Sequence, residues 1–234
     1  MQLLITGTDT GVGKTLVTCG LAAYLVSLGK RVGVMKPVET GCKEQNGVLY
    51  SRDSSLLAFF SNSSLSLDEL CPYRFGPPLA PSVAADMAGV SILPENILSI
   101  FRRISDQHDV VLVEGSGGLL VPLVHRYTFS NLARDMEVPV IVVVGSKLGA
   151  LNHTLLTLSH AHNSSIPVKG YILNNPMPIL DEATRTNAAT LEQLTDVPCL
   201  GHIPHLELGE NQELTRKMLI ETFRNRIDIE NLMA

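Results

Sequence analysis

Short apolar runs alternate with amphipathic stretches along the whole chain. The apolar runs are rich in Val, Ile and Leu without polar alternation, which is typical of strands covered on both faces. They predict strands at residues 2–6, 31–36, 109–114, 139–144, 168–174 and 198–202. The stretches between them carry apolar residues at helical spacing and predict helices near residues 14–28, 53–60, 82–88, 94–106, 129–136, 149–162, 181–195 and 212–226.

This alternation of strands and helices predicts the fold class, because such a chain forms a parallel sheet with helices on both faces. We predict an α/β fold with three α/β/α layers and a mostly parallel central sheet. No repeat, low-complexity tract or linker interrupts the pattern, so residues 1–234 are expected to form a single domain. Residues 71–81 contain four prolines and are predicted to form an irregular loop near the functional site.

Composition narrows the classes of partner and compartment. The chain has 234 residues, is 45% hydrophobic and carries a formal net charge of −5, which gives no basis for binding nucleic acid or an anionic membrane. Its four cysteines lie far apart, as expected for reduced thiols in the cytoplasm. No targeting segment is visible, and the apolar run at residues 138–144 is too short to span a bilayer. We therefore expect a cytoplasmic protein.

The most informative segment lies between the first predicted strand and the first predicted helix. It reads Gly-Thr-Asp-Thr-Gly-Val-Gly-Lys-Thr over residues 7–15. Glycines let backbone N–H groups turn toward phosphate oxygens, Lys14 adds a positive charge, and the Thr15 hydroxyl can hold Mg²⁺. Five residues separate Gly7 from Gly13, where the common pattern has four. We predict a divergent phosphate loop that binds a nucleoside triphosphate; the alternative is a flexible turn with an exposed lysine.

Polar residues also follow the other predicted strands, and in a parallel sheet these strand ends meet at one edge. Glu114 ends the third strand, where it is either a metal-binding acid or simply an exposed one. Lys36 ends the second strand and is equally well interpreted as a cation that stabilises substrate charge or as a surface lysine. For Asp53, local chemistry favours a helix N-cap over a metal ligand.

Other candidate residues add little. Thr40 offers a hydroxyl beside Gly41, although most such pairs are ordinary turns. The seven histidines lack the spacing of a metal site, and no Ser-His-acid arrangement stands out. Neither a structural metal nor a covalent nucleophile is predicted.

Several short segments carry a family resemblance in a fixed order. They are Gly-Thr-Asp-Thr-Gly-Val-Gly-Lys-Thr at 7–15, Lys-Pro-Val-Glu-Thr-Gly at 36–41, Val-Glu-Gly-Ser-Gly-Gly at 113–118, Pro-Val-Ile-Val-Val-Val-Gly-Ser-Lys-Leu-Gly at 139–149, Asn-His at 152–153, Asn-Asn at 174–175 and Leu-Gly-His-Ile-Pro at 200–204. Over nearly the whole chain they resemble the dethiobiotin synthetases, ATP-dependent enzymes with a phosphate-loop NTPase fold. The five-residue glycine spacing is what that family shows.

The resemblance implies closure of a ureido ring in biotin synthesis. In that reaction, 7,8-diaminopelargonic acid takes up CO₂ at one amine to form a carbamate. ATP then phosphorylates the carbamate, and the second amine attacks the mixed anhydride to give dethiobiotin, ADP and phosphate. Because this chemistry creates and moves negative charge, cations and oriented N–H groups are expected to dominate catalysis.

The resemblance also assigns the catalytic and metal-binding residues. By family analogy, Lys14 and Lys36 stabilise the carbamate and the transferring phosphoryl group. Mg²⁺ is expected on Thr15, Asp53 and Glu114, so the resemblance reverses the order of the two interpretations of Asp53.

Substrate, nucleotide and subunit contacts follow by the same analogy. Thr10 and Thr40 are expected to contact the diamine or its carbamate. The enzymes of this family are homodimers, and Gly149, Leu151 and Asn152 would bind the carboxylate tail of the diamine held by the partner subunit. The expected nucleotide contacts are Gly11, Val12, Gly13, Lys14, Thr15, Leu16, Asp53, Glu114, Gly115, Ser116, Gly117, Asn174, Asn175, Pro204, His205, Leu206 and Glu210.

Three positions depart from the pattern that the family shows. Thr40 stands where a serine is common, His205 where an aromatic residue such as tryptophan occurs, and Gly11 where some members have glutamate.

Amidating synthetases of the cobyric-acid type need a glutaminase domain, for which this chain has no room. Partitioning and positioning ATPases of the ParA and MinD type usually carry a lysine where this chain has Asp9. The choice between ATP and CTP stays open.

Overall fold

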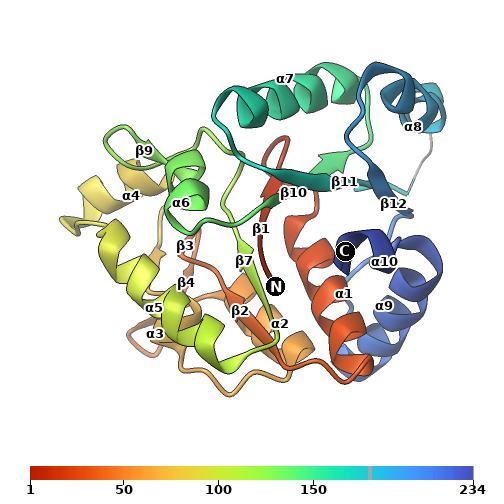
Figure 1. Cartoon of the computed structure of the whole chain (residues 1–234). Helices are drawn as coiled ribbons and strands as arrows, with labels where there is room; N and C mark the ends of the chain where they lie inside the picture. Colours follow the sequence, from red (N-terminus) through yellow and green to blue (C-terminus); the bar gives the residue numbers. More distant parts are fainter. Residues whose placement is uncertain (179–180, 234) are drawn as a thin grey trace.

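A six-stranded parallel sheet forms the centre of the protein in the computed structural model, which describes residues 1–178 and 181–233. Its strand order is β12–β11–β10–β1–β7–β2 (Figure 1), and all five pairings are parallel. The strands are β1 (Gln2–Gly7), β2 (Val32–Met35), β7 (Val110–Glu114), β10 (Val140–Gly145), β11 (Val168–Asn174) and β12 (Cys199–Ile203). All six predicted strands are therefore confirmed, each to within one residue at its ends.

Helices cover both faces of this sheet, because alternate strand residues point to opposite sides. In β1, Leu4 packs on one face, and Leu3 and Ile5 pack on the other. The helices on the Leu4 face are α5 (Pro94–Gln107), α6 (Phe129–Asp135), α7 (Ala150–Asn163) and α8 (Glu182–Leu194). Those on the other face are α1 (Lys14–Ser27), α2 (Arg52–Ser61), α9 (Gln212–Arg226) and α10 (Ile229–Met233). The predicted three-layer α/β/α fold is confirmed (Figure 1).

The short elements were harder to predict. The sequence pattern predicted α4 (Pro81–Ala88) but not the four-residue α3 (Leu67–Leu70) or α10. It also missed the small pairs of strands, since two or three residues are too few for a periodic pattern. These pairs are β3 (Val38–Thr40) with β6 (Tyr73–Phe75), β4 (Lys43–Gln45) with β5 (Val48–Tyr50) and β8 (Pro122–Val124) with β9 (Tyr127–Thr128). The prediction of an irregular loop over 71–81 is thus wrong where β6 pairs with β3.

The topology gathers the chemistry-bearing segments at one edge. Because the six strands run in the same direction, the segments that follow β1, β2, β7, β10, β11 and β12 all emerge at the carboxyl edge of the sheet. Within the described residues, no helix has both the length and the apolar character needed to cross a lipid bilayer.

Candidate active site

The loop between β1 and α1 is held in one shape by glycines and by a residue of β11. Gly11 and Gly13 have φ angles of 74° and 96°, which glycine adopts at little cost. A Cβ atom on Gly13 would lie 2.2 Å from the side-chain nitrogen of Asn174. That nitrogen donates a hydrogen bond of 2.9 Å to the Val12 carbonyl. Because the Asn174 side chain approaches the loop so closely, position 13 requires glycine. The hydrogen bond from Asn174 to Val12 then holds the loop against β11.

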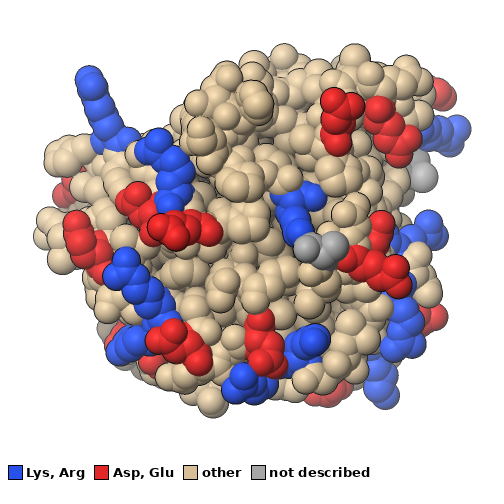
Figure 2. Space-filling view, in the orientation of Figure 1, with Lys and Arg blue, Asp and Glu red and all other residues tan. Residues whose placement is uncertain are grey.

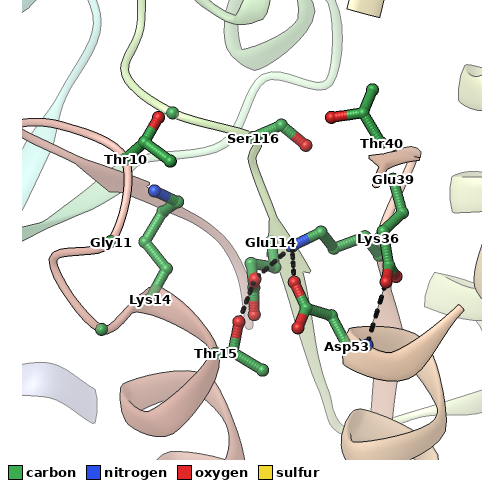
Figure 3. Close-up of a pocket in the computed structure, with 12 residues that line it drawn as sticks. Thr10, Gly11, Lys14, Thr15, Lys36, Glu39, Thr40, Asp53, Glu114 and Ser116 are labelled. Atoms are coloured by element: carbon green, nitrogen blue, oxygen red, sulfur yellow. Dashed lines mark hydrogen bonds and ion pairs between the residues drawn. The ribbon is translucent and has the colours of Figure 1, made fainter. Parts of the chain in front are cut away.

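Lys14 and Thr15 begin α1 and point toward the sheet edge (Figure 3). Lys14 is only 7% exposed, and its Nζ donates to the Asp9 carbonyl at 3.1 Å. The Thr15 hydroxyl donates to Glu114 Oε1 at 2.9 Å. The alternative of a flexible turn with an exposed lysine is therefore wrong. Instead, a helix N-terminus and a buried ammonium converge where an anionic phosphate chain would bind.

The environment of Lys14 predicts proton uptake when a nucleotide binds. Burial lowers the pKa of Lys14 to about 8, against the opposing effect of the Glu114 carboxylate. The free protein therefore holds Lys14 protonated below that pH and increasingly neutral above it. Phosphate oxygens favour the ammonium form, so ATP binding at about pH 9 is expected to take up about one proton, and far less at about pH 7. Calorimetry in buffers of different ionisation enthalpy measures this uptake, and Lys14→Met should remove its pH dependence.

Lys36 forms a buried ion triad with two carboxylates (Figure 3). Its Nζ lies 2.5 Å from Glu114 Oε1 and 2.6 Å from Asp53 Oδ2. Lys36 is 5% exposed and Glu114 is fully buried. Burial opposes the charge on Lys36, but the two carboxylates outweigh it and raise the pKa of Lys36 above its usual value. The alternatives of a surface lysine and of an exposed acid at a strand end are thus both wrong.

Asp53 does not cap its helix. Ser51 is the N-cap residue of α2, and Asp53 lies two positions further on. Burial would raise the pKa of the Asp53 carboxyl, but the neighbouring Lys36 ammonium lowers it overall. The N-cap interpretation that local chemistry favoured is therefore wrong, and the carboxylate faces Lys36 instead.

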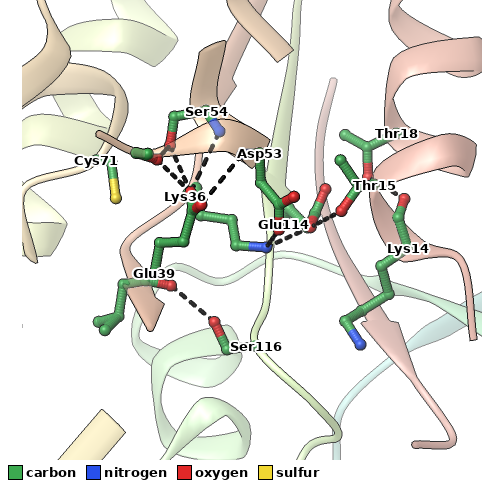
Figure 4. A network of polar contacts seen from close by, with 12 residues as sticks. Lys14, Thr15, Thr18, Lys36, Glu39, Asp53, Ser54, Cys71, Glu114 and Ser116 are labelled. Atoms are coloured by element: carbon green, nitrogen blue, oxygen red, sulfur yellow. Dashed lines mark hydrogen bonds and ion pairs between the residues drawn. The ribbon is translucent and has the colours of Figure 1, made fainter. Parts of the chain in front are cut away.

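Glu39 is a buried acid that the sequence analysis did not single out. It accepts hydrogen bonds from the backbone N–H groups of Asp53 and Ser54 and from the hydroxyls of Ser51 and Ser54 (Figure 4). Its position directly before Thr40 in a segment shared with the family was the available signal. Nothing in its local pattern, however, indicates a contact with a helix 14 residues later.

A cavity of about 310 Å³ unites most of the predicted site residues. It is lined by Thr10, Gly11, Gly13, Lys14, Thr15, Lys36, Glu39, Thr40, Asp53, Glu114, Ser116 and Gly117. A second cavity of about 520 Å³ shares Thr10, Thr40, Ser116 and Gly117 with the first and extends over the apolar segment 78–81 and Val121. The site thus combines a polar, charged chamber with an adjoining apolar one.

Other predicted contacts lie outside these two cavities. The Val12 side chain, within the loop, is buried, and Leu16 packs on the α1 side of the core. The backbone N–H of Gly115 donates to the Ile5 carbonyl of β1. Asn175 accepts a hydrogen bond at its Oδ1 from the ring of His202, at 2.9 Å. Two further groups lie past β12 and at the start of α7: Pro204, His205, Leu206 and Glu210, and Gly149, Leu151 and Asn152. Their roles in binding stay predictions.

The oxygen atoms beside the phosphate loop fit a divalent cation. The second carboxylate oxygen of Glu114, Oε2, is buried and has no hydrogen-bond partner among the described residues. The Thr15 hydroxyl donates to the other Glu114 oxygen, and the Asp53 carboxylate pairs with the same Lys36 ammonium as Glu114 does. The described residues hold no cluster of three or more His, Cys, Asp and Glu side chains suited to an all-protein metal site. One or two carboxylates with phosphate oxygens is the mode that Mg²⁺ uses.

Surface charge offers no large basic patch on the face shown in Figure 2. Lysine and arginine side chains there are interspersed with aspartate and glutamate, in keeping with the net charge of −5.

Known proteins resemble this chain in sequence and in fold. The model of an AAA domain family matches residues 1–213. The ATP-dependent dethiobiotin synthetase BioD of Thermodesulfovibrio yellowstonii is 41% identical over 98% of this chain and 97% of that protein. BioD of Bacillus subtilis strain 168 is 37% identical over 98% of this chain and 96% of its own length. BioD of Nitrosopumilus maritimus is 34% identical over 99% of each.

Solved structures with a similar fold are more distant in sequence. A chain of the MinC:MinD cell division protein complex of Aquifex aeolicus superposes with a TM-score of 0.57 at 14% identity, covering 96% of this chain and 94% of that one. A ParA family ATPase from Chlorobium tepidum gives 0.55 at 14% identity, covering 96% and 92%. At such identities the likeness shows the fold alone. The identities of 34–41% over nearly the whole length, by contrast, show that the chain belongs to the family of ATP-dependent dethiobiotin synthetases.

Proposed function

We propose that this chain uses ATP and CO₂ to close the ureido ring of 7,8-diaminopelargonic acid, giving dethiobiotin, ADP and phosphate. The observation that carries the proposal is the convergence of two buried lysines and a phosphate loop on one cavity, in a chain of this family. We take the whole chain, residues 1–234, to act as one domain, since both hydrophobic clusters pack on the same sheet.

The two lysines act on the negative charge that the reaction develops. Lys14, at the N-terminus of α1, is positioned to stabilise the phosphoryl group as it leaves ATP. Lys36, at the end of β2, is positioned to stabilise the carbamate and the mixed anhydride. Both ammonium groups are largely withdrawn from water, so their electrostatic effect is stronger than at an exposed position. Thr10 and Thr40 line the same cavity and orient the diamine or its carbamate by hydrogen bonds, and Ser116 lines it as a nucleotide contact.

Thr15, Asp53 and Glu114 would hold Mg²⁺, since their oxygens surround the end of the phosphate loop and one Glu114 oxygen has no partner among the described residues. When bound, the ion neutralises charge on the phosphate oxygens.

The adjoining apolar cavity suits the aliphatic tail of the diamine, because segment 78–81 and Val121 line it with largely apolar surface. The tail ends in a carboxylate, for which we propose Gly149, Leu151 and Asn152 of a second copy of the chain. Exposed apolar residues flank that segment: Leu148 is 85% exposed and Leu156 is 61% exposed. Apolar surface of this kind favours burial in a homodimer.

We place the nucleotide base near Asn175 and residues 204–206, and its ribose near Glu210. The support is positional: these residues follow β11 and β12 at the carboxyl edge, beyond the loop that Asn174 holds. His202 bonds to the Asn175 side chain and thereby limits how that amide turns toward the base. The remaining predicted contacts, Val12, Leu16 and Gly115, would act through the backbone of their loops.

Incubation of the purified protein with the diamine, bicarbonate, ATP and Mg²⁺ tests the function directly. Dethiobiotin detected by mass spectrometry, and absent when any one component is left out, is the expected result. ATP hydrolysis that ignores the diamine and yields no product would instead indicate a switch ATPase of the ParA and MinD type. Replacing ATP by CTP in the same assay determines the nucleotide preference.

A mixing experiment tests whether the partner subunit completes the site. Lys36→Met and Asn152→Ala are each expected to be inactive, since one removes the cation and the other the tail contact. If Asn152 acts on the neighbouring subunit's substrate, a mixed dimer contains one intact site. Mixing the two variants under conditions of subunit exchange should therefore restore part of the dethiobiotin synthesis. No recovery, with exchange demonstrated by mass spectrometry, would place both residues in the same subunit's site.

A further inference from the structure

Glu39 is a buried carboxylate, and each group that donates a hydrogen bond to it among the described residues is neutral. Its Oε1 accepts the Asp53 backbone N–H at 3.1 Å, and its Oε2 accepts the Ser54 backbone N–H at 3.3 Å. The hydroxyls of Ser51 and Ser54 also donate to Oε2. The side chain comes from β3 and reaches the first turn of α2, as Figure 4 shows.

These backbone donors are those that a helix leaves unpaired at its N-terminus. The N-cap residue Ser51 makes no side-chain cap to the first turn; its hydroxyl donates its one proton to Glu39 instead, and its oxygen lies 2.5 Å from the Ser54 hydroxyl oxygen. A negative charge at this end of a helix is favoured by the helix dipole. Glu39 therefore caps α2 from a strand that is distant in sequence.

The same contact has a consequence for Asp53. An aspartate at the start of a helix tends to bond to nearby backbone N–H groups. Here Glu39 occupies the N–H groups of Asp53 and Ser54. The Asp53 carboxylate is turned the other way and lies 2.6 Å from the Lys36 ammonium (Figure 3).

We propose that Glu39 is a positioning residue, which keeps the Asp53 carboxylate turned into the cavity by occupying the backbone donors that would otherwise attract it. The inference rests on the proposed function in one respect, since it takes the Asp53 side of the cavity to face Mg²⁺ and the nucleotide phosphates. It predicts that loss of Glu39 weakens the coupling between Mg²⁺ and nucleotide binding, beyond any loss of stability.

The test compares the Kd of ATP with and without Mg²⁺ by calorimetry, in the absence of diamine. Glu39→Ala is expected to reduce the gain in affinity that Mg²⁺ provides by about 10- to 100-fold, the usual effect of removing a group that orients a metal ligand. Asp181→Ala is the matched control, because Asp181 caps α8 on the other face of the sheet through the Thr184 N–H. It should lower the thermal midpoint as Glu39→Ala does while leaving the Mg²⁺ gain unchanged.

A double-mutant cycle separates positioning from capping alone. If Glu39 acts through Asp53, Glu39→Gln reduces the Mg²⁺ gain in the wild type but changes it by less than about twofold in an Asp53→Asn background. Glu39→Gln keeps the shape of the side chain and one acceptor oxygen, so it provides the test if Glu39→Ala does not fold.

An unchanged Mg²⁺ gain in a folded Glu39 variant, or equal effects of Glu39→Gln in both backgrounds, would overturn the inference. Because the binding measurement needs no diamine, failure of ring closure and failure of this positioning role give different results.

Discussion

Lys14→Ala is expected to lower kcat for dethiobiotin formation by about 10²- to 10³-fold, the usual effect of removing one preorganised group that stabilises developing charge. Lys14 is 7% exposed at the N-terminus of α1, so water screens its charge poorly during phosphoryl transfer. Among the described residues the Lys14 ammonium makes one hydrogen bond, to the Asp9 carbonyl; a bond to a charged group contributes about 1.5–3 kcal/mol to folding, and burial of the charge, which lowers the Lys14 pKa, offsets much of it. Initial rates at saturating substrates should therefore fall while the urea midpoint of unfolding changes little.

Lys43→Ala is the matched control for this prediction. Lys43 is an exposed lysine on β4 and does not line the cavity. Its removal changes the net charge by the same amount and should leave kcat within about twofold of the wild type, as exposed charges usually contribute little. Near-full activity of Lys14→Ala would contradict the role of this lysine.

Lys36→Met is expected to lower both activity and stability. The variant leaves the fully buried Glu114 without its cation, and breaking a buried ion pair from one side typically costs about 3–5 kcal/mol. The expected loss in kcat is at least about 10²-fold, since the cation proposed to stabilise the carbamate is removed. Urea unfolding at neutral pH and product assays below the unfolding midpoint measure the two effects separately.

The pH dependence of this destabilisation follows from Asp53. The Lys36 ammonium lowers the pKa of the Asp53 carboxyl from the usual 3.8. The ionised Asp53 carboxylate therefore stabilises the folded protein at pH values above the usual pKa of 3.8. This stabilisation is lost as the pH falls through the lowered pKa of the folded protein. The difference in unfolding free energy between wild type and Lys36→Met should therefore narrow in acid. As a control, Arg31→Met breaks an exposed pair with Asp109 and should affect stability little at either pH. A full-size effect of Lys36→Met that ignores pH would contradict the ion-triad explanation.

The phosphate loop was predictable because its determinants are local. Nine consecutive residues contain the glycines, the lysine and the threonine, and the flanking apolar runs predict the strand and the helix. The central strands were predictable for a related reason. Each carries a continuous apolar run, since both of its faces are covered by helices.

The order of the strands in the sheet could not be predicted from the sequence pattern. Nothing in the apolar runs indicates that β1 lies between β7 and β10, or that β2 lies at one end of the sheet. Order depends on which crossovers bury the most apolar surface together, and that is a property of the whole chain.

In the candidate site, too, the positions of residues along the chain were predictable, but their contacts with distant segments were not. Lys36 and Glu114 were predicted at strand ends, but only the structure brings them within 2.5 Å of each other, 78 residues apart in the chain. For Asp53, local chemistry favoured the wrong role because it omitted the competing acid. Glu39 supplies that competition from 14 residues earlier, through β3, which is too short to leave a pattern.

The sequence by itself determined the fold class, the phosphate loop and, through its ordered motifs, the family. These are carried by runs of neighbouring residues, in which backbone preference and apolar periodicity act locally. Only the tertiary structure decided the charge partners of Lys36, the direction of the Asp53 carboxylate and the capping of α2 by Glu39. Those features depend on distances between segments far apart in the chain, because hydrogen bonds and buried ion pairs form only where packing brings donor and acceptor into contact.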